Sequence, residues 1–396
     1  MQSIFRELLI LMIVVWAVAV ILRRIGLPTI MGELLLGVIV GPAVLGWVHP
    51  NEVIEVLAQM GIFFLMLHSG LTTAPREFFS AVKSSIGVAI VGAIVPFTVA
   101  LTIALLFGLE LRSAIFVGLV FTATAVVITL KVLRDLGLAN TRMARMIIAS
   151  CVLDDLLTLV FFGFILGLLR EGSFDPMDLL TVSAKVIFFF SVSIAVGYWG
   201  YPLFKHPFRD RSGKGFTFVL VLALAAGLFA EAIGLHIILG AYIAGLFLEE
   251  RVASKELIQK VEDRLSGIAY SFLGPIFFIS LGFHITFDAI KSSGIWMIIA
   301  LTAGVFVAQI LSAGLMARLA GLSRMEAVGV GVGMSGRAEL AFILASLGLS
   351  MGFLDAEVFS ILIFSSFLLN LLTSIGLKLL ARRLGGSVDH GISVDY

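Results

Sequence analysis

Charged side chains are scarce in this chain: only 13% of its 396 residues are Asp, Glu, Lys or Arg, whereas 60% are hydrophobic. A soluble protein of this length exposes far more polar surface than this composition supplies. The net charge of +1 provides no basic patch for nucleic acid. One cysteine, Cys151, excludes a disulfide framework, and six histidines form no HExxH pair for a metal. We therefore expect a polytopic membrane protein in a lipid bilayer, without enzymatic activity or a cofactor.

Long apolar runs are numerous, and a helix needs about 18–20 apolar residues to cross about 30 Å of hydrocarbon. The sequence predicts an all-α protein with about 13 transmembrane helices in a membrane domain over residues 1–380, followed by a short cytoplasmic tail, 381–396. The predicted spans are 7–22, 29–48, 53–71, 86–108, 113–131, 143–169, 178–204, 215–234, 236–248, 268–286, 294–317, 324–350 and 357–380.

Basic residues are distributed unevenly between the predicted loops. The loops after odd-numbered spans hold most of the 27 lysines and arginines. Cytoplasmic loops are the ones enriched in Lys and Arg. The pattern predicts an external N-terminus and a cytoplasmic C-terminus.

Two predicted spans in equivalent places lose their apolar character. The odd number of spans permits an inverted repeat of halves 1–170 and 215–380, linked by the helix near 178–204. The fifth span contains Thr122-Ala123-Thr124-Ala125, and the twelfth contains a glycine run that ends at Gly336. Paired interruptions of this kind are typical of a binding site near the membrane midplane in secondary transporters.

The sixth span carries two adjacent carboxylates, Asp154 and Asp155, in an otherwise apolar helix. Each costs about 2.5–3.5 kcal/mol at a helix centre on insertion scales, so a functional site is the default interpretation. A carboxyl group removed from water holds its proton to higher pH, and a like-charged neighbour adds to this effect. Such a group takes up a proton or a monovalent cation in turn, and this competition is the basis of exchange.

A second pair of charges, Arg337 and Glu339, follows the glycine run of the twelfth span. A paired Arg and Glu costs less in the membrane than either residue alone. The pair either ties an unwound helix to its neighbours or takes part directly in transport, and the sequence leaves both readings open.

These residues carry a resemblance that extends over the whole membrane domain. The chain resembles the monovalent cation:proton antiporter-2 family of the sodium/proton exchanger superfamily. The landmarks are Gly32-Glu33-Leu34-Leu35-Leu36-Gly37, Gly41-Pro42, Thr122-Ala123-Thr124-Ala125, Asp154-Asp155, Gly240-Ala241-Tyr242-Ile243-Ala244-Gly245, Pro275-Ile276-Phe277-Phe278-Ile279-Ser280-Leu281-Gly282 and Arg337-Ala338-Glu339.

The resemblance implies an NhaA-like antiporter fold in which the fifth and twelfth spans unwind and cross. It further implies a core domain, with helices near 113–169 and 324–380, beside a dimerisation domain in a homodimer. Asp155 is then the carrier of cation and proton, Asp154 is its partner in binding Na⁺, and Thr124 lines the site. Arg337, Glu339, Thr122 and Gln309 are the expected supporting residues, and the membrane is the plasma membrane of a prokaryote.

Gln309 departs from the family pattern, because electrogenic relatives place a lysine at that point of the eleventh span. An amide does not titrate, so we expect electroneutral one-for-one exchange of Na⁺, and of Li⁺, for H⁺. K⁺/H⁺ exchange is the main alternative, and a cation channel is a more remote one. An intramembrane aspartyl protease is excluded, because adjacent residues on one helix point about 100° apart and form no facing dyad.

Overall fold

All regular secondary structure in the described part of the chain is helical, and no strand occurs there. The computed structural model describes residues 2–25, 29–72, 75–125, 141–171, 176–199, 214–247, 255–287 and 294–384, together with residues 129, 132, 133, 136 and 138. Each of the thirteen predicted spans contains at least one helix, so the all-α prediction is confirmed. Within the described ranges, seven helices are long and apolar enough to cross a membrane by themselves. Parts of the predicted fifth span, the end of the linking helix near 178–204 and most of the tail lie outside the described residues.

The chain divides into two compact units, each built from both halves of the sequence. Unit 1 comprises Met1–Pro75 and Leu159–Phe283, and unit 2 comprises Arg76–Thr158 and His284–Tyr396. The helices of unit 1 are α1 (Gln2–Ile25), α2 (Thr29–Val40), α3 (Glu52–Thr72), α8 (Pro176–Trp199), α10 (Lys214–Ala232), α11 (Ile237–Leu246), α12 (Lys255–Ile268), the π-helix η1 (Ala269–Leu273) and α13 (Gly274–Phe283).

Unit 1 is held together by close backbone packing at glycines. The Cα of Gly37 on α2 faces the backbone of α13 at Ile279 and Gly282, and a side chain at Gly37 would overlap that backbone. Gly70 of α3 and Gly245 of α11 meet in the same way. In a bilayer, small residues let helix backbones approach closely enough for van der Waals packing. Several glycines among the family landmarks are therefore structural residues of unit 1.

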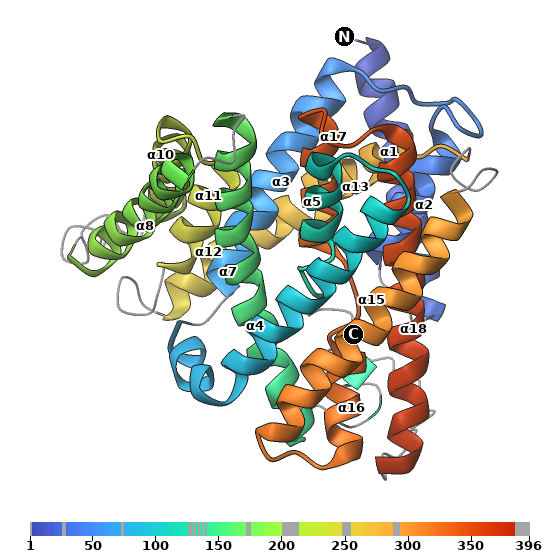
Figure 1. Cartoon of the computed structure of the whole chain (residues 1–396). Coiled ribbons are helices and arrows are strands. Elements are labelled where there is room, and N and C mark those ends of the chain that lie inside the picture. The colour runs from blue at the N-terminus through green and yellow to red at the C-terminus, as the bar shows by residue number, and fades with distance from the viewer. Residues whose placement is uncertain are drawn as a thin grey trace. The chain divides into compact units, whose positions relative to one another are not determined.

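Unit 2 contains both interrupted spans (Figure 1). Its helices are α4 (Pro75–Leu106), α5 (Leu111–Val120), the first part of α7 (Arg142–Glu171), α15 (Gly294–Leu319), α16 (Arg324–Gly333), α17 (Glu339–Ser350) and α18 (Ala356–Leu384). The short helices α5 and α17 lie side by side, teal and red in Figure 1. The rings of Phe116 and Phe353 stack between these regions with centroids 4.9 Å apart. Unit 2 also includes α4 and α15, which lie outside the core ranges expected from the resemblance.

The second interruption begins later than the glycine run suggests. Helix α16 continues through Gly333, and the chain is non-helical only from Met334 to Ala338. Within α16 the glycines are packing residues: a side chain at Gly331 would lie 2.6 Å from the Cα of Ile310 on α15. The glycines thus bring α15 and α16 together, and the break is formed by the residues that follow them.

Candidate functional site

The two interruptions meet in the interior of unit 2. The amide nitrogen of Ala125, after the end of α5, donates to the carbonyl oxygen of Gly336 at 2.9 Å. The Thr129 hydroxyl donates to the carbonyl oxygen of Gly333 at 2.6 Å. The segment around Ala125 to Thr129 and the break after α16, which lie far apart in the sequence, therefore exchange polar contacts with each other. The predicted crossing of two unwound helices is confirmed at this point of the structure.

The carbonyl groups released at the end of α16 all find donors, as buried backbone groups require. The Ser335 hydroxyl donates to Gly331 at 2.8 Å, and Thr129 serves Gly333. The Arg337 guanidinium donates through Nη1 to Met334 at 2.8 Å and to Gly336 at 3.0 Å. Arg337 thus replaces the missing turn of helix and is itself fully buried.

Arg337 is also held from two further helices by neutral amide side chains. Its Nη2 donates to Oε1 of Gln309 on α15 at 2.8 Å. Asn370 of α18 grips its backbone: the amide nitrogen of Arg337 donates to Oδ1 at 2.8 Å, and Nδ2 donates to the Arg337 carbonyl oxygen at 2.6 Å. Asn370 was not among the predicted site residues. A lone buried amide in the apolar run of the last span is the signal that would have found it.

The aspartate pair of α7 lies next to this network but differs from it in hydrogen bonding. Asp154 is fully buried, and among the described residues neither of its carboxylate oxygens has a hydrogen-bond partner. It lies beside Thr124 and within electrostatic reach of Arg337. The Thr124 hydroxyl is likewise buried without a partner. Buried polar groups left open in this way are where ions and ordered waters bind.

Asp155 differs from its neighbour in accessibility. The residue is only half-buried, although its Oδ1 is enclosed and has no partner. Asp154 and Glu339 are the charged groups that act on it. The structure therefore places Asp154 in a fully buried position within electrostatic reach of Arg337 and leaves Asp155 partly exposed.

Among the predicted supporting residues, Glu339 lies near Asp155 and does not pair with Arg337, although the sequence suggested such a pair. Glu339 is the first residue of α17, is half-buried, and is one of the charged groups near Asp155. The hydrogen bonds of Arg337 go to backbone carbonyls and to Gln309, so the two residues of this motif do not pair. The Thr122 hydroxyl donates to the carbonyl oxygen of Gly118, one turn earlier, at 3.2 Å.

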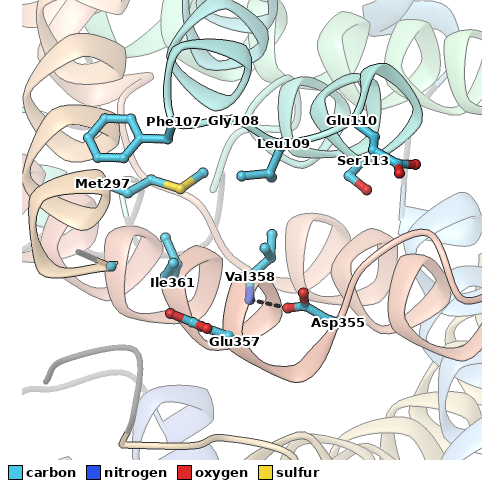
Figure 2. Close-up of a pocket in the computed structure, with 11 residues that line it drawn as sticks. Phe107, Gly108, Leu109, Glu110, Ser113, Met297, Asp355, Glu357, Val358 and Ile361 are labelled. Carbon is cyan, nitrogen blue, oxygen red and sulfur yellow. Dashed lines mark hydrogen bonds between the residues drawn. The ribbon is translucent and has the colours of Figure 1, made fainter. Parts of the chain in front are cut away.

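A separate acidic pocket of about 410 Å³ opens at one end of unit 2 (Figure 2). Its carboxylates are Glu110 from the turn before α5, and Asp355 and Glu357 at the start of α18. Oδ1 of Asp355 accepts a hydrogen bond from the Val358 amide at 2.7 Å and caps that helix. All three acids are exposed to solvent, and none of the predicted site residues lines the pocket. The buried aspartates are therefore the better candidate for ion binding.

A bundle of apolar helices with two broken segments crossing beside buried carboxylates defines a secondary transporter, an integral membrane protein. Comparison with known proteins makes this assignment more specific. The profile of the family described as "Sodium/hydrogen exchanger, transmembrane" matches residues 8–383. The chain therefore belongs to this family, and its members are transporters and not enzymes.

Individual relatives agree with the family assignment. The chain is 34% identical over 358 residues to the Na⁺/H⁺-K⁺ antiporter GerN of Bacillus cereus, covering 90% of each chain. It is 35% identical over 343 residues to the probable Na⁺/H⁺ antiporter GerT of the same organism, covering 86% of this chain and 89% of the relative. The fold matches the sodium proton antiporter MjNhaP1 of Methanocaldococcus jannaschii, with a TM-score of 0.79, 18% identity, and coverage of 98% of this chain and 99% of that one.

Proposed function

We propose that this protein exchanges Na⁺, and also Li⁺, for H⁺ across the plasma membrane of a prokaryote, with Asp155 as the carrier. The observation that supports this role most directly is the difference between the two aspartates. Both have buried oxygens without a hydrogen-bond partner among the described residues, yet Asp154 is fully buried and Asp155 is only half-buried. A carboxylate that is reachable and unsatisfied binds a cation in its ionised form and a proton in its neutral form, but not both together.

The proposed transport cycle is alternating access. We infer that unit 2, which holds the crossing, Asp155 and the Arg337 network, serves as the moving core domain. Its movement would expose Asp155 to one side of the membrane and then to the other. The external N-terminus, the homodimer and the assignment to the monovalent cation:proton antiporter-2 branch belong to the same proposal.

Exchange is proposed to be electroneutral, with one Na⁺ for one H⁺. Position 309 holds an amide, which has no proton to lose, and Arg337 keeps its charge throughout because a guanidinium does not deprotonate in proteins. Asp155 is then the one group whose occupant changes during the cycle. K⁺ is the second candidate for the transported cation, since GerN is named as a Na⁺/H⁺-K⁺ antiporter.

The proposal is tested with purified protein in liposomes that contain a pH-sensitive dye. We expect Na⁺ or Li⁺ addition to drive proton movement in the wild type and in an Asp355→Asn control, but not in Asp155→Asn. Potassium ions added in a parallel series decide between the two candidate cations. Proton movement that persists in Asp155→Asn would remove the carrier assignment, and a rate that follows an imposed membrane potential would remove electroneutrality.

A further inference from the structure

The hydrogen bonds of Arg337 single out Gln309 as more than the neutral replacement of a lysine. Nη2 of Arg337 has Gln309 Oε1 as its hydrogen-bond acceptor at 2.8 Å, and both side chains are fully buried. Within the part of the chain that the structure describes, Nε of Arg337 and Nε2 of Gln309 have no hydrogen-bond partner. The oxygen of the Gln309 amide therefore accepts a hydrogen bond from the guanidinium, whereas its nitrogen donates to none of the described residues.

Asp154 is the acid that this guanidinium faces. The two groups interact electrostatically, yet both carboxylate oxygens of Asp154 lack a hydrogen bond. Arg337 thus compensates the charge of Asp154 without closing on it as an ion pair. Arginine and carboxylate groups frequently form a bidentate ion pair. The acceptors that keep Arg337 from doing so are the two backbone carbonyls that hold Nη1 and, on Nη2, the side chain of Gln309.

Gln309 is well placed to provide that restraint, because α15 and α16 are locked together beside it. Gly331 of α16 packs against the backbone of Ile310 and Gln309. On the other side, a side chain at Gly92 of α4 would lie 3.1 Å from Nε2 of Gln309. The side chain of Gln309 therefore lies against α4, and its backbone lies against α16.

We propose that Gln309 is a positioning residue that holds Arg337 as a fixed positive charge at a set distance from Asp154. This inference rests on the proposed function and states which side chain keeps the compensating charge in place. The charge on Asp154 remains partly compensated, and its residual field acts on the neighbouring Asp155. The titratable groups around the two aspartates are Cys151 on α7, which faces Arg337, and Glu339 on α17, which faces Asp155.

Two substitutions at position 309 are expected to shift the pH dependence of transport in opposite directions. Gln309→Met removes the acceptor, so Arg337 closes on Asp154, and the midpoint of the transport–pH profile moves to lower pH. Gln309→Glu draws Arg337 away from Asp154, and the midpoint moves to higher pH. A change of about 2 Å in the distance between the Arg337 charge and the carboxylate, at an effective dielectric of about 20, corresponds to a shift of about one pH unit in the midpoint.

The experiment compares the wild type, these two variants and Thr302→Val. It records Na⁺-driven proton movement in liposomes from about pH 6 to about pH 9. Thr302 is a matched control, because it is buried on the same helix and its hydroxyl makes no hydrogen bond to the described residues. Midpoint shifts of opposite sign, with Thr302→Val unchanged, support the proposal. Shifts of the same sign, or no shift, overturn it, and Gln309→Glu alone decides if the methionine variant does not fold. Absence of transport in the wild type would instead refute the proposed function.

Discussion

Asn370→Leu removes the two hydrogen bonds that hold the second crossing segment and keeps the number and branching of the side-chain heavy atoms. Asn370 is 1% exposed and makes two hydrogen bonds with the backbone of Arg337, at 2.8 and 2.6 Å. Both backbone groups would then be buried without partners, at a cost of about 1–3 kcal/mol each. The substitution should therefore destabilise the protein by about 2–6 kcal/mol.

The expected loss can be measured as a shift in thermal stability. With an unfolding entropy of about 2.1 cal/mol/K per residue, it corresponds to a fall of roughly 2–7 °C in Tm. Thermal unfolding of the purified protein in detergent is the assay. Ser374→Ala on the same helix is the control, because its hydroxyl bonds only to the carbonyl oxygen of Asn370, one turn earlier, at 2.9 Å. Equal Tm values for the two variants would refute the role of these two hydrogen bonds, as would full transport activity in Asn370→Leu.

Two other predictions concern packing and charge in unit 2. Gly331→Ala should lower Tm, because the added methyl group meets the Cα of Ile310 at 2.6 Å and overpacking costs about 1–3 kcal/mol. Gly267→Ala is the control: no atom lies within 4 Å of the added methyl group, so Tm should stay unchanged or rise. A lower Tm for Gly267→Ala than for Gly331→Ala would contradict the packing. Gln309→Lys should lower Tm by placing an ammonium group against the Arg337 guanidinium, and Arg337→Gln in the same chain should restore part of the loss. A lysine variant as stable as the wild type would show that the two side chains do not meet.

The polar network was predicted from the sequence only in part. Asp154, Asp155 and Arg337 stand out in any reading, because a charge in an apolar helix is expensive wherever that helix packs. Arg337 and Glu339 do not pair in the structure, although they lie only two residues apart in the sequence. Arg337 lies in the non-helical segment, whereas Glu339 begins α17, so the two side chains lie in different local structures. Asn370 lies 33 residues from Arg337 and was missed for the same reason.

The sequence alone determined the properties that depend on a single segment. Apolar length specifies a membrane helix, and a run such as Thr122-Ala123-Thr124-Ala125 indicates a break in a helix, because both effects are local free energies of transfer and hydrogen bonding. Which donor reaches which released carbonyl is a property of packing between helices. Only the tertiary structure decided that Arg337 is held by Gln309 and Asn370, that Asp154 is fully buried, and that Asp155 is only half-buried.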